Sequence, residues 1–135
     1  MIPSEWERIH YFVAKEFDSP DSPGSGSMMD RELVRGLDLA RSIAGIPFKV
    51  SSGYRTAVHN SSVGGKPDSA HLYWCAADIV AIRPETRYLV LRGLVMAGFR
   101  RLEVAPRHIH VDVMDDLAHP SGMALFLDTV TGDLV

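Results

Sequence analysis

The chain has 135 residues, of which 46% are hydrophobic and 23% charged, a balance that suits one globular domain around a single core. The formal net charge is -3 and no long Lys/Arg run is present, which argues against a nucleic-acid partner because nucleic-acid binding needs a concentrated basic face. Cys75 is the single cysteine, so no internal disulfide can form, and no apolar run is long enough to cross a bilayer. We therefore expect a single domain over residues 1–135 without a membrane partner, and a monomer is favoured.

Residues 1–29 are predicted to be an N-terminal extension and loop packed on that domain. Phe12, Val13 and Phe17 indicate a short segment laid on the domain surface by its apolar side. Residues 18–27 are rich in Pro, Gly and Ser and have no periodicity, which predicts an ordered or semi-ordered surface loop. Charges among the first eight residues leave no apolar stretch for a signal peptide, so we expect synthesis in the cytoplasm.

The next segment has the pattern of an amphipathic helix. Asp30 is a plausible N-cap and Gly45 is placed to end the helix. Between them apolar residues recur at spacings of three and four, at Leu33, Leu37, Ala40 and Ala44. Residues 48–50 indicate a short strand that leads into the polar stretch 51–55.

A buried strand and a second helix are predicted further along. Residues 76–82 are nearly continuously apolar with Asp78 set among them, which is typical of a buried strand carrying one functional carboxylate. Pro84 suits the first position of a helix and Gly98 suits its end.

The last predicted elements are strands. Residues 101–104 and 108–113 are expected to form a hairpin with a tight connection at 105–107, and residues 123–127 to form a final strand. Helices and strands therefore alternate irregularly, with one hairpin late in the chain. This pattern favours an α+β fold, a single domain with a mostly antiparallel sheet and helices on one face.

Three residues far apart in the sequence have the chemistry of a metal site. His71 precedes the apolar strand, Asp78 lies within it and His110 lies on the predicted hairpin, so that their side chains can converge at the sheet. Two imidazoles and one carboxylate are what a zinc ion takes in a catalytic site that keeps one position open. The alternative is that they are ordinary polar residues, because a lone histidine is more often a hydrogen-bonding group than a ligand.

Short motifs around these residues agree in order and separation with one known family. They are Ser-Gly-Tyr-Arg at 52–55, Ser69-x-His71 with Ala76-x-Asp78, and Gly98-Phe99 leading to His110-Val-Asp112. Over about residues 30–113 the chain resembles the zinc D-alanyl-D-alanine carboxypeptidases and their relatives among bacteriophage and bacterial peptidoglycan peptidases, which have a hedgehog-type fold. The stretch that starts with Phe17-Asp-Ser-Pro also looks like that of members carried by tailed phages.

The resemblance implies Zn2+ held by His71, Asp78 and His110, with Arg55 and Ser69 facing the substrate. The chemistry agrees, because an arginine fork pairs bidentately with a carboxylate and a peptidoglycan stem peptide offers carboxylates at its end or on its side chains. Two structural alternatives remain open: Arg55 as a surface charge with a local ion pair, and Ser69 as no more than a loop cap.

The chain departs from the family pattern at two positions. The family usually has Gly where this chain has Trp74, so either the backbone there does not adopt a positive φ or the turn is reshaped. Relatives often carry a carboxylate or a histidine three residues before the last zinc ligand. Here that position is Arg107, which cannot serve as a base at neutral pH.

Two residues are therefore candidates for the catalytic base. If residues 106–107 form a two-residue turn, Glu103 lies across from His110 on the same face, although it could instead be the cross-strand partner of a basic residue. His108 shares that face and is the alternative, as a base or as a stabiliser of the oxyanion. Asp112 also shares it, and we expect Asp112 to orient a ligand or a neighbouring arginine.

These observations predict a zinc metallopeptidase that hydrolyses an amide bond in peptidoglycan stem peptides, as a D,D-carboxypeptidase or as an endopeptidase. A phage or prophage origin fits best, as for an endolysin that reaches the bacterial cell wall through a holin or a virion. The alternative is a non-catalytic zinc-containing module of a phage particle that binds peptidoglycan or a protein. A third hypothesis is a structural phage component whose site has decayed and binds no zinc.

Overall fold

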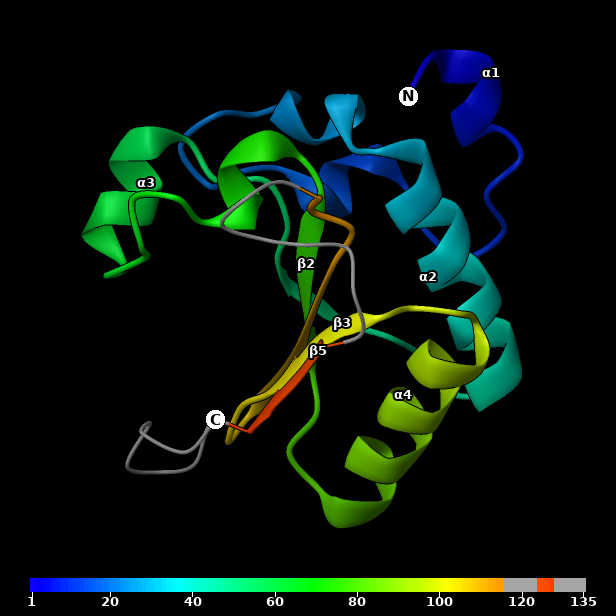
Figure 1. The fold of residues 1–135 in the computed structure, drawn as a ribbon. Helices are drawn as coiled ribbons and strands as arrows, with labels where there is room; N and C mark the ends of the chain where they lie inside the picture. Colours follow the sequence, from blue (N-terminus) through cyan, green and yellow to red (C-terminus); the bar gives the residue numbers. More distant parts are fainter. Residues whose placement is uncertain (116–123, 128–135) are drawn as a thin grey trace.

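One sheet organises the part of the chain that the computed structural model describes, residues 1–115 and 124–127 (Figure 1). Its strands are β1 (Val50–Ser52), β2 (Ala76–Val80), β3 (Arg101–Val104), β4 (His108–Asp112) and β5 (Ala124–Leu127). They lie in the order β1-β2-β4-β3-β5, and all neighbours are antiparallel except β3 and β5, which are parallel. The predicted α+β domain with a mostly antiparallel sheet is confirmed.

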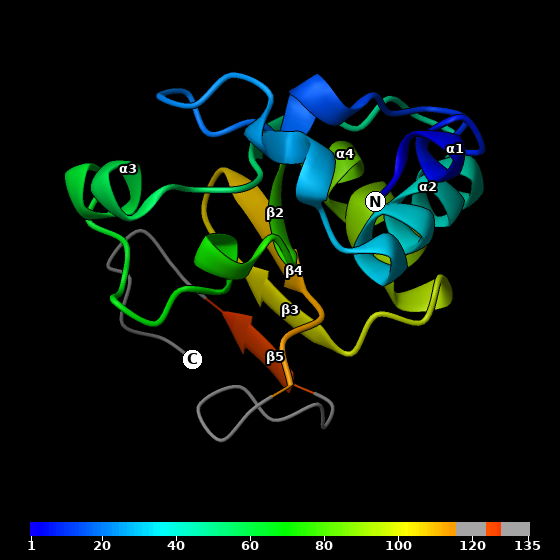
Figure 2. The same ribbon diagram turned by 90° about the horizontal axis from the view of Figure 1, so that it is seen from above.

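Helices and 3-10 turns fill the intervals between the strands. The helices are α1 (Pro3–Trp6), α2 (Arg31–Ala44), α3 (Ala57–Ser62) and α4 (Pro84–Met96), and the turns are η1 (Ala14–Phe17), η2 (Ser25–Met28) and η3 (Ala70–Tyr73). The long helices α2 and α4 cover one face of the sheet, whereas α3 lies on the other side (Figures 1 and 2). Within the described residues, no helix is both long and apolar enough to span a membrane.

The ends of both long helices follow from their sequences. The Asp30 carboxylate accepts the backbone N–H of Leu33 at 3.1 Å, and Gly45 ends α2 in the left-handed region at φ 71°. Pro84 occupies the start of α4, where its missing N–H costs no hydrogen bond, and Gly98 follows the helix at φ 99°. The predicted helix boundaries are confirmed to within two residues.

The core lies between the sheet and the two long helices. Alternate residues of each strand point to it, because successive side chains of a strand face opposite sides of the sheet. It is formed by fully buried apolar side chains that include Leu33, Leu37, Val90, Leu94, Ile79, Ile109 and Val111. The remaining alternate residues, Asp78 and His110 among them, face the opposite side, where loops rather than long helices cover the sheet.

The apolar side of the predicted N-terminal segment reaches the main core: Phe12 and Phe17 are 3% and 0% exposed, although Val13, assigned to the same side, is exposed. Residues 1–29 therefore complete the core. The first strand is Val50–Ser52 rather than residues 48–50, because Phe48 is buried ahead of the strand and the register shifts between Val50 and Ser52.

The predicted last strand is present at the positions that the structure describes. β5 starts at Ala124, and Met123 lies outside the described residues.

Candidate metal centre

The polar face of the sheet carries one row of functional side chains. Asp78 on β2 lies opposite His110 on β4, and His110 lies opposite Glu103 on β3. His71 approaches this row from η3, whose first N–H groups are capped by Ser69: the Ser69 hydroxyl accepts the backbone N–H of His71 at 3.3 Å. Residues 69–78 thus connect a short turn to a buried strand and bring the imidazole of His71 over the carboxylate of Asp78.

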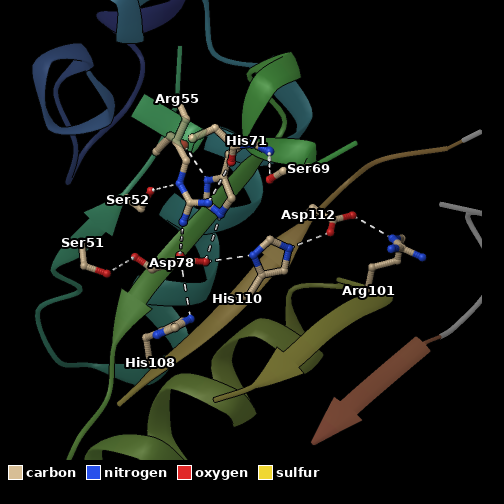
Figure 3. A network of polar contacts seen from close by, with 12 residues as sticks. Ser51, Ser52, Arg55, Ser69, His71, Asp78, Arg101, His108, His110 and Asp112 are labelled. Carbon is tan, nitrogen blue, oxygen red and sulfur yellow. Dashed lines mark hydrogen bonds and ion pairs between the residues drawn. The ribbon is translucent and has the colours of Figure 1, made fainter. Parts of the chain in front are cut away.

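His71, Asp78 and His110 form a compact cluster (Figure 3). Asp78 Oδ1 lies 3.2 Å from His71 Nε2 and 2.9 Å from His110 Nδ1. One ligand atom from each residue lies within 4.8 Å of the other two, and His71 and Asp78 are buried. Among the described residues this is the one cluster with the composition and spacing to hold a metal ion.

The second nitrogen of each imidazole already has a hydrogen-bond acceptor. His71 Nδ1 lies 2.6 Å from the Gly53 carbonyl, and His110 Nε2 lies 2.8 Å from Asp112 Oδ2. When each imidazole carries its single proton on this nitrogen, His71 Nε2 and His110 Nδ1 each have a lone pair that can bind a metal ion beside Asp78. Histidine ligands of metals are oriented in this way, and two nitrogens with one carboxylate oxygen suit zinc.

The carboxylates and imidazoles of the cluster shift each other's pKa values through their hydrogen bonds. Burial alone would raise the pKa of Asp78, but hydrogen bonds from His110 and His71 hold this pKa well below its usual range. Burial alone would lower the pKa of His110, yet its hydrogen bonds with Asp112 and Asp78 raise the pKa to about 9. Asp78 is therefore a carboxylate at any physiological pH.

Asp112 links His110 to an arginine. Its Oδ2 faces His110 Nε2, while Oδ1 accepts a hydrogen bond of 2.7 Å from Arg101 Nε and one of 3.1 Å from the backbone of Met114. Asp112 is buried, so this pair fixes its carboxylate in place. The sequence suggested that Asp112 orients a ligand or an arginine, and in the structure it contacts both.

Arg55 is not a surface charge, since only 15% of its side chain is exposed. Its guanidinium donates to Ser52 Oγ at 3.0 Å, to Asn60 Oδ1 at 3.2 Å and to Asp78 Oδ2 at 3.4 Å. Its backbone N–H donates to the His71 carbonyl at 3.0 Å. Contact of Arg55 and Ser69 with a substrate stays a prediction.

The two candidate bases lie on either side of His110. Ala105 N donates to the His108 carbonyl at 3.0 Å, so residues 106–107 form the two-residue connection that sets Glu103 opposite His110. The Glu103 carboxylate makes no hydrogen bond or ion pair with the residues that the structure describes, although its backbone is part of the sheet. His108 Nε2 lies 3.8 Å from Asp78 Oδ2, and 36% of its side chain is exposed. The catalytic role of either residue stays a prediction.

Trp74 adopts a left-handed conformation, with φ 59°, and no other non-glycine residue in the described ranges has a positive φ. The suggestion that the backbone there avoids a positive φ is therefore wrong. The indole stacks on Tyr54 with ring centroids 4.2 Å apart, and its Nε1 donates to the Ser25 carbonyl at 2.9 Å. The Trp74 carbonyl accepts the N–H of Asp30, also at 2.9 Å. Trp74 thus ties the N-terminal loop to the turn that carries His71.

Sequence reasoning missed Asn60, Ser52, Gly53 and Arg101, all of which contact a residue of the site. Arg101 could have been found, because the predicted hairpin register already set it opposite Asp112. Asn60 lies in a polar stretch that looks like an exposed loop, and its burial at 3% exposure gave no signal in the sequence.

Comparison with known proteins agrees with this geometry. The family model described as Peptidase M15 matches residues 10–112, which include the three clustered residues together with Arg55 and Asp112. No curated protein matches the chain. Because the match covers most of the chain, and the site has the composition that the motifs implied, this protein belongs to the peptidase M15 family.

Proposed function

We propose that this protein is a zinc-dependent peptidase that hydrolyses an amide bond in peptidoglycan stem peptides. The observation that carries the proposal is the cluster of His71 Nε2, Asp78 Oδ1 and His110 Nδ1, whose outer nitrogens are bound by Gly53 and Asp112. Membership of the peptidase M15 family supports a metallopeptidase and fits a cell-wall peptide as substrate.

The three clustered residues would hold the zinc ion. Zinc bound there supplies Lewis-acid chemistry, which polarises a scissile carbonyl and makes water a nucleophile near neutral pH. With the ion bound, Asp112 and the Gly53 carbonyl would accept the one remaining proton of His110 and His71 on the outer nitrogens, which leaves the inner nitrogens to the metal. Arg55 retains two of its five N–H groups beyond the three that it donates to protein acceptors, and these would bind a carbonyl or carboxylate oxygen of the substrate.

Proton transfer is assigned to Glu103 or His108. A carboxylate at Glu103, opposite His110, would accept the proton of the attacking water and deliver it to the leaving amine. His108 Nε2 is the other acceptor, and in its protonated form it would stabilise the developing oxyanion. Glu103 is preferred because it has no competing ion pair among the described residues.

The first test measures zinc and cleavage together. Protein prepared without chelator is expected to contain about one zinc ion per chain and to release a new amine from muropeptides, detected by mass spectrometry. His71→Ala should lose both, whereas His10→Ala, which changes an exposed histidine away from the cluster, should lose neither. The masses of the products distinguish a D,D-carboxypeptidase, which releases a terminal residue, from an endopeptidase.

Arg107 favours the second candidate function, a non-catalytic zinc module that binds peptidoglycan or a protein. It stands where relatives often have a base, and it is exposed. Glu103→Gln and His108→Ala should both keep zinc. If the wild type cleaves stem peptides and one variant slows cleavage by about 100-fold or more, that residue is the base. Zinc without cleavage in the wild type favours the module, and absence of zinc favours a decayed site.

The biological setting is also part of the proposal. We propose a phage or prophage origin, in which a holin or a virion would bring the peptidase to the cell wall. Lysis of a bacterial host on co-expression with a holin, and no lysis without it, would support this setting.

A further inference from the structure

Asn60 is a buried polar residue next to the proposed metal centre that the mechanism above does not use. It lies on α3 and is 3% exposed. Its Oδ1 accepts a hydrogen bond from Arg55 Nη1 at 3.2 Å, and its Nδ2 donates to the Lys66 carbonyl at 2.9 Å. The two ends of one amide thus connect Arg55 to the loop that follows α3.

Arg55 is held from three directions. Ser52 Oγ on β1 accepts from Nε and Asp78 Oδ2 on β2 accepts from Nη2 (Figure 3). Asn60 Oδ1 on α3 accepts from Nη1. A planar guanidinium with acceptors on all three nitrogens has a fixed position and a fixed orientation. The loss of Asn60 would leave the Nη1 end without an acceptor and allow the plane to rotate about the remaining bonds.

The position of Arg55 determines how Asp78 presents its oxygens. Oδ1 faces both imidazole nitrogens, at 3.2 Å and 2.9 Å, whereas Oδ2 is 3.4 Å from Arg55 Nη2. The guanidinium therefore contacts Oδ2, which also lies 3.8 Å from His108 Nε2, whereas Oδ1 alone contacts His71 and His110. Asp78 is left with a single oxygen directed at the space between His71 and His110.

Gly65 shows how closely this support is packed. A Cβ at this position would lie 1.9 Å from Asn60 Oδ1 and 3.0 Å from Arg55 Nη1. Only glycine leaves the amide in contact with the guanidinium, and the Gly65 N–H also donates to the Asn60 carbonyl at 2.8 Å. The loop after α3 therefore closes directly on the Asn60–Arg55 contact.

We propose that Asn60 is a positioning residue for the metal centre, which acts through Arg55 to keep Asp78 a one-oxygen ligand. This inference rests on the proposed zinc site. Asn60 touches neither a metal ligand nor a substrate, so its effect must pass through the guanidinium. If the Asn60 amide only held the loop through Lys66, its removal would affect zinc binding equally with and without Arg55.

The test is the zinc dissociation constant, measured by competition with a chromophoric chelator. Asn60→Ala should weaken zinc binding by about 10- to 100-fold, the range found when groups that orient metal ligands are removed. Asn60→Asp keeps an oxygen for Arg55 but loses the donor to Lys66. The zinc dissociation constant of this variant should therefore stay within about threefold of the wild-type value or fall below it. Equal weakening in both variants would assign Asn60 to the loop and overturn the proposal.

A double-mutant cycle isolates the path through Arg55. In an Arg55→Ala background, Asn60→Ala should cause no further loss of zinc affinity, whereas independent effects would multiply. The visible spectrum of the Co2+-loaded protein should change in Asn60→Ala and remain that of the wild type in Asn60→Asp, because it reports the coordination geometry. The inference would be contradicted if the losses of zinc affinity caused by Asn60→Ala and Arg55→Ala multiply in the double variant, or if the Co2+ spectrum is unchanged in all variants.

Two further measurements separate a failure of this inference from a failure of folding or of the proposed function. If Asn60→Ala does not fold, Gly65→Ala tests the same contact, because its methyl group displaces Asn60 Oδ1 and should weaken zinc binding while the amide is still present. Zinc affinity of Gly65→Ala equal to the wild type would then overturn the inference. A wild type that binds no zinc would instead refute the proposed function itself.

Discussion

Trp74 combines an unfavourable backbone with several favourable contacts. A left-handed conformation costs a non-glycine residue about 1–2 kcal/mol. The parallel stack on Tyr54 offsets about 0.5–1.5 kcal/mol of this, and the indole hydrogen bond to Ser25 about 1 kcal/mol. This balance explains how a tryptophan can occupy a turn position where glycine is usual in the family.

Substitutions at Trp74 should reveal this balance. Trp74→Ala loses the stack and keeps the strained backbone, whereas Trp74→Gly loses the stack and relieves the strain. We expect both variants to be less stable than the wild type. In urea unfolding of the metal-free protein, the free energy of unfolding of Trp74→Gly should exceed that of Trp74→Ala by about 1 kcal/mol. An Ala variant as stable as the Gly variant would mean that residue 74 is not held in the left-handed region.

Asp112 allows a test of ligand orientation. Asp112→Asn keeps the shape of the side chain but replaces a charged acceptor of His110 Nε2 by a neutral amide. We expect zinc affinity to fall about 10- to 100-fold in the same chelator competition. Asp68→Asn changes an exposed carboxylate in the loop before His71 and serves as the control. A loss of the same size in the control would point to general electrostatics rather than to orientation.

The residues of the site were predictable to different degrees for a physical reason. His71, Asp78, His110 and Asp112 carry functional groups whose type and spacing indicate metal chemistry. Asn60 is an amide among other polar residues, and its role depends on a contact with Arg55 that only the packing of α3 against the sheet creates. Sequence spacing contains no information about such packing.

At the scale of elements, the N-terminal segment was the least predictable part of the fold. Its apolar residues are few and have no regular period, so the sequence predicted a segment packed on the domain but not that its phenylalanines enter the main core. In the structure the Phe17 carbonyl accepts the N–H of Tyr54, and a Cβ on Gly53 would lie 2.6 Å from Phe17 Cα. The helices and the hairpin were predictable, since caps and alternation mark their ends locally, whereas this contact joins residues far apart in the chain.

Asp21 connects the N-terminal loop to α3 and gives a pH-dependent test. Hydrogen bonds from Ser19 and then from Thr56 lower the pKa of Asp21 below its ordinary value. A carboxyl group with a lower pKa in the folded state stabilises the fold above its unfolded pKa, and this contribution is lost as the pH falls through the folded pKa. NMR titration should show the pKa of Asp21 rising toward 3.8 in Ser19→Ala.

The matched control for Asp21 is Ser61→Ala, which removes an exposed hydroxyl on α3 that forms no side-chain bond with the described residues. It should leave the titration of Asp21 unchanged. A wild-type Asp21 that titrates at its ordinary value would show that the loop does not bind α3 through this carboxylate.

The contact between the two long helices depends on Gly93. A Cβ there would lie 2.6 Å from the Ala40 carbonyl on α2, which is backbone and cannot move aside. Gly93→Ala should therefore lower the free energy of unfolding by about 1–3 kcal/mol, although helix propensity alone would raise it by about 1 kcal/mol. Arg92→Ala on the exposed side of α4 should change stability by less than about 0.5 kcal/mol in the same urea titration. A stabilised Gly93→Ala would contradict the close approach of α2 and α4.

At the scale of the whole molecule, the site draws on nearly every layer of the fold. Asp78 and His110 come from neighbouring strands, His71 from η3, and Arg55 from the loop after β1. The N-terminal loop contacts this assembly through Trp74. A metal ion that binds atoms from several separate elements binds the folded chain much more tightly than the unfolded one, so metal binding and folding are coupled.

Removal of metal tests that coupling. At a free zinc concentration about 1,000-fold above the dissociation constant, binding should stabilise the fold by about 4 kcal/mol, because the ion binds the native state selectively. For a domain of this size the melting temperature should rise by roughly 10–20 °C over that of the chelator-treated protein. The rise should disappear in His71→Ala and persist in His10→Ala. An equal rise in both variants would show that zinc acts elsewhere on the chain, because His71 supplies an atom of the cluster and His10 does not.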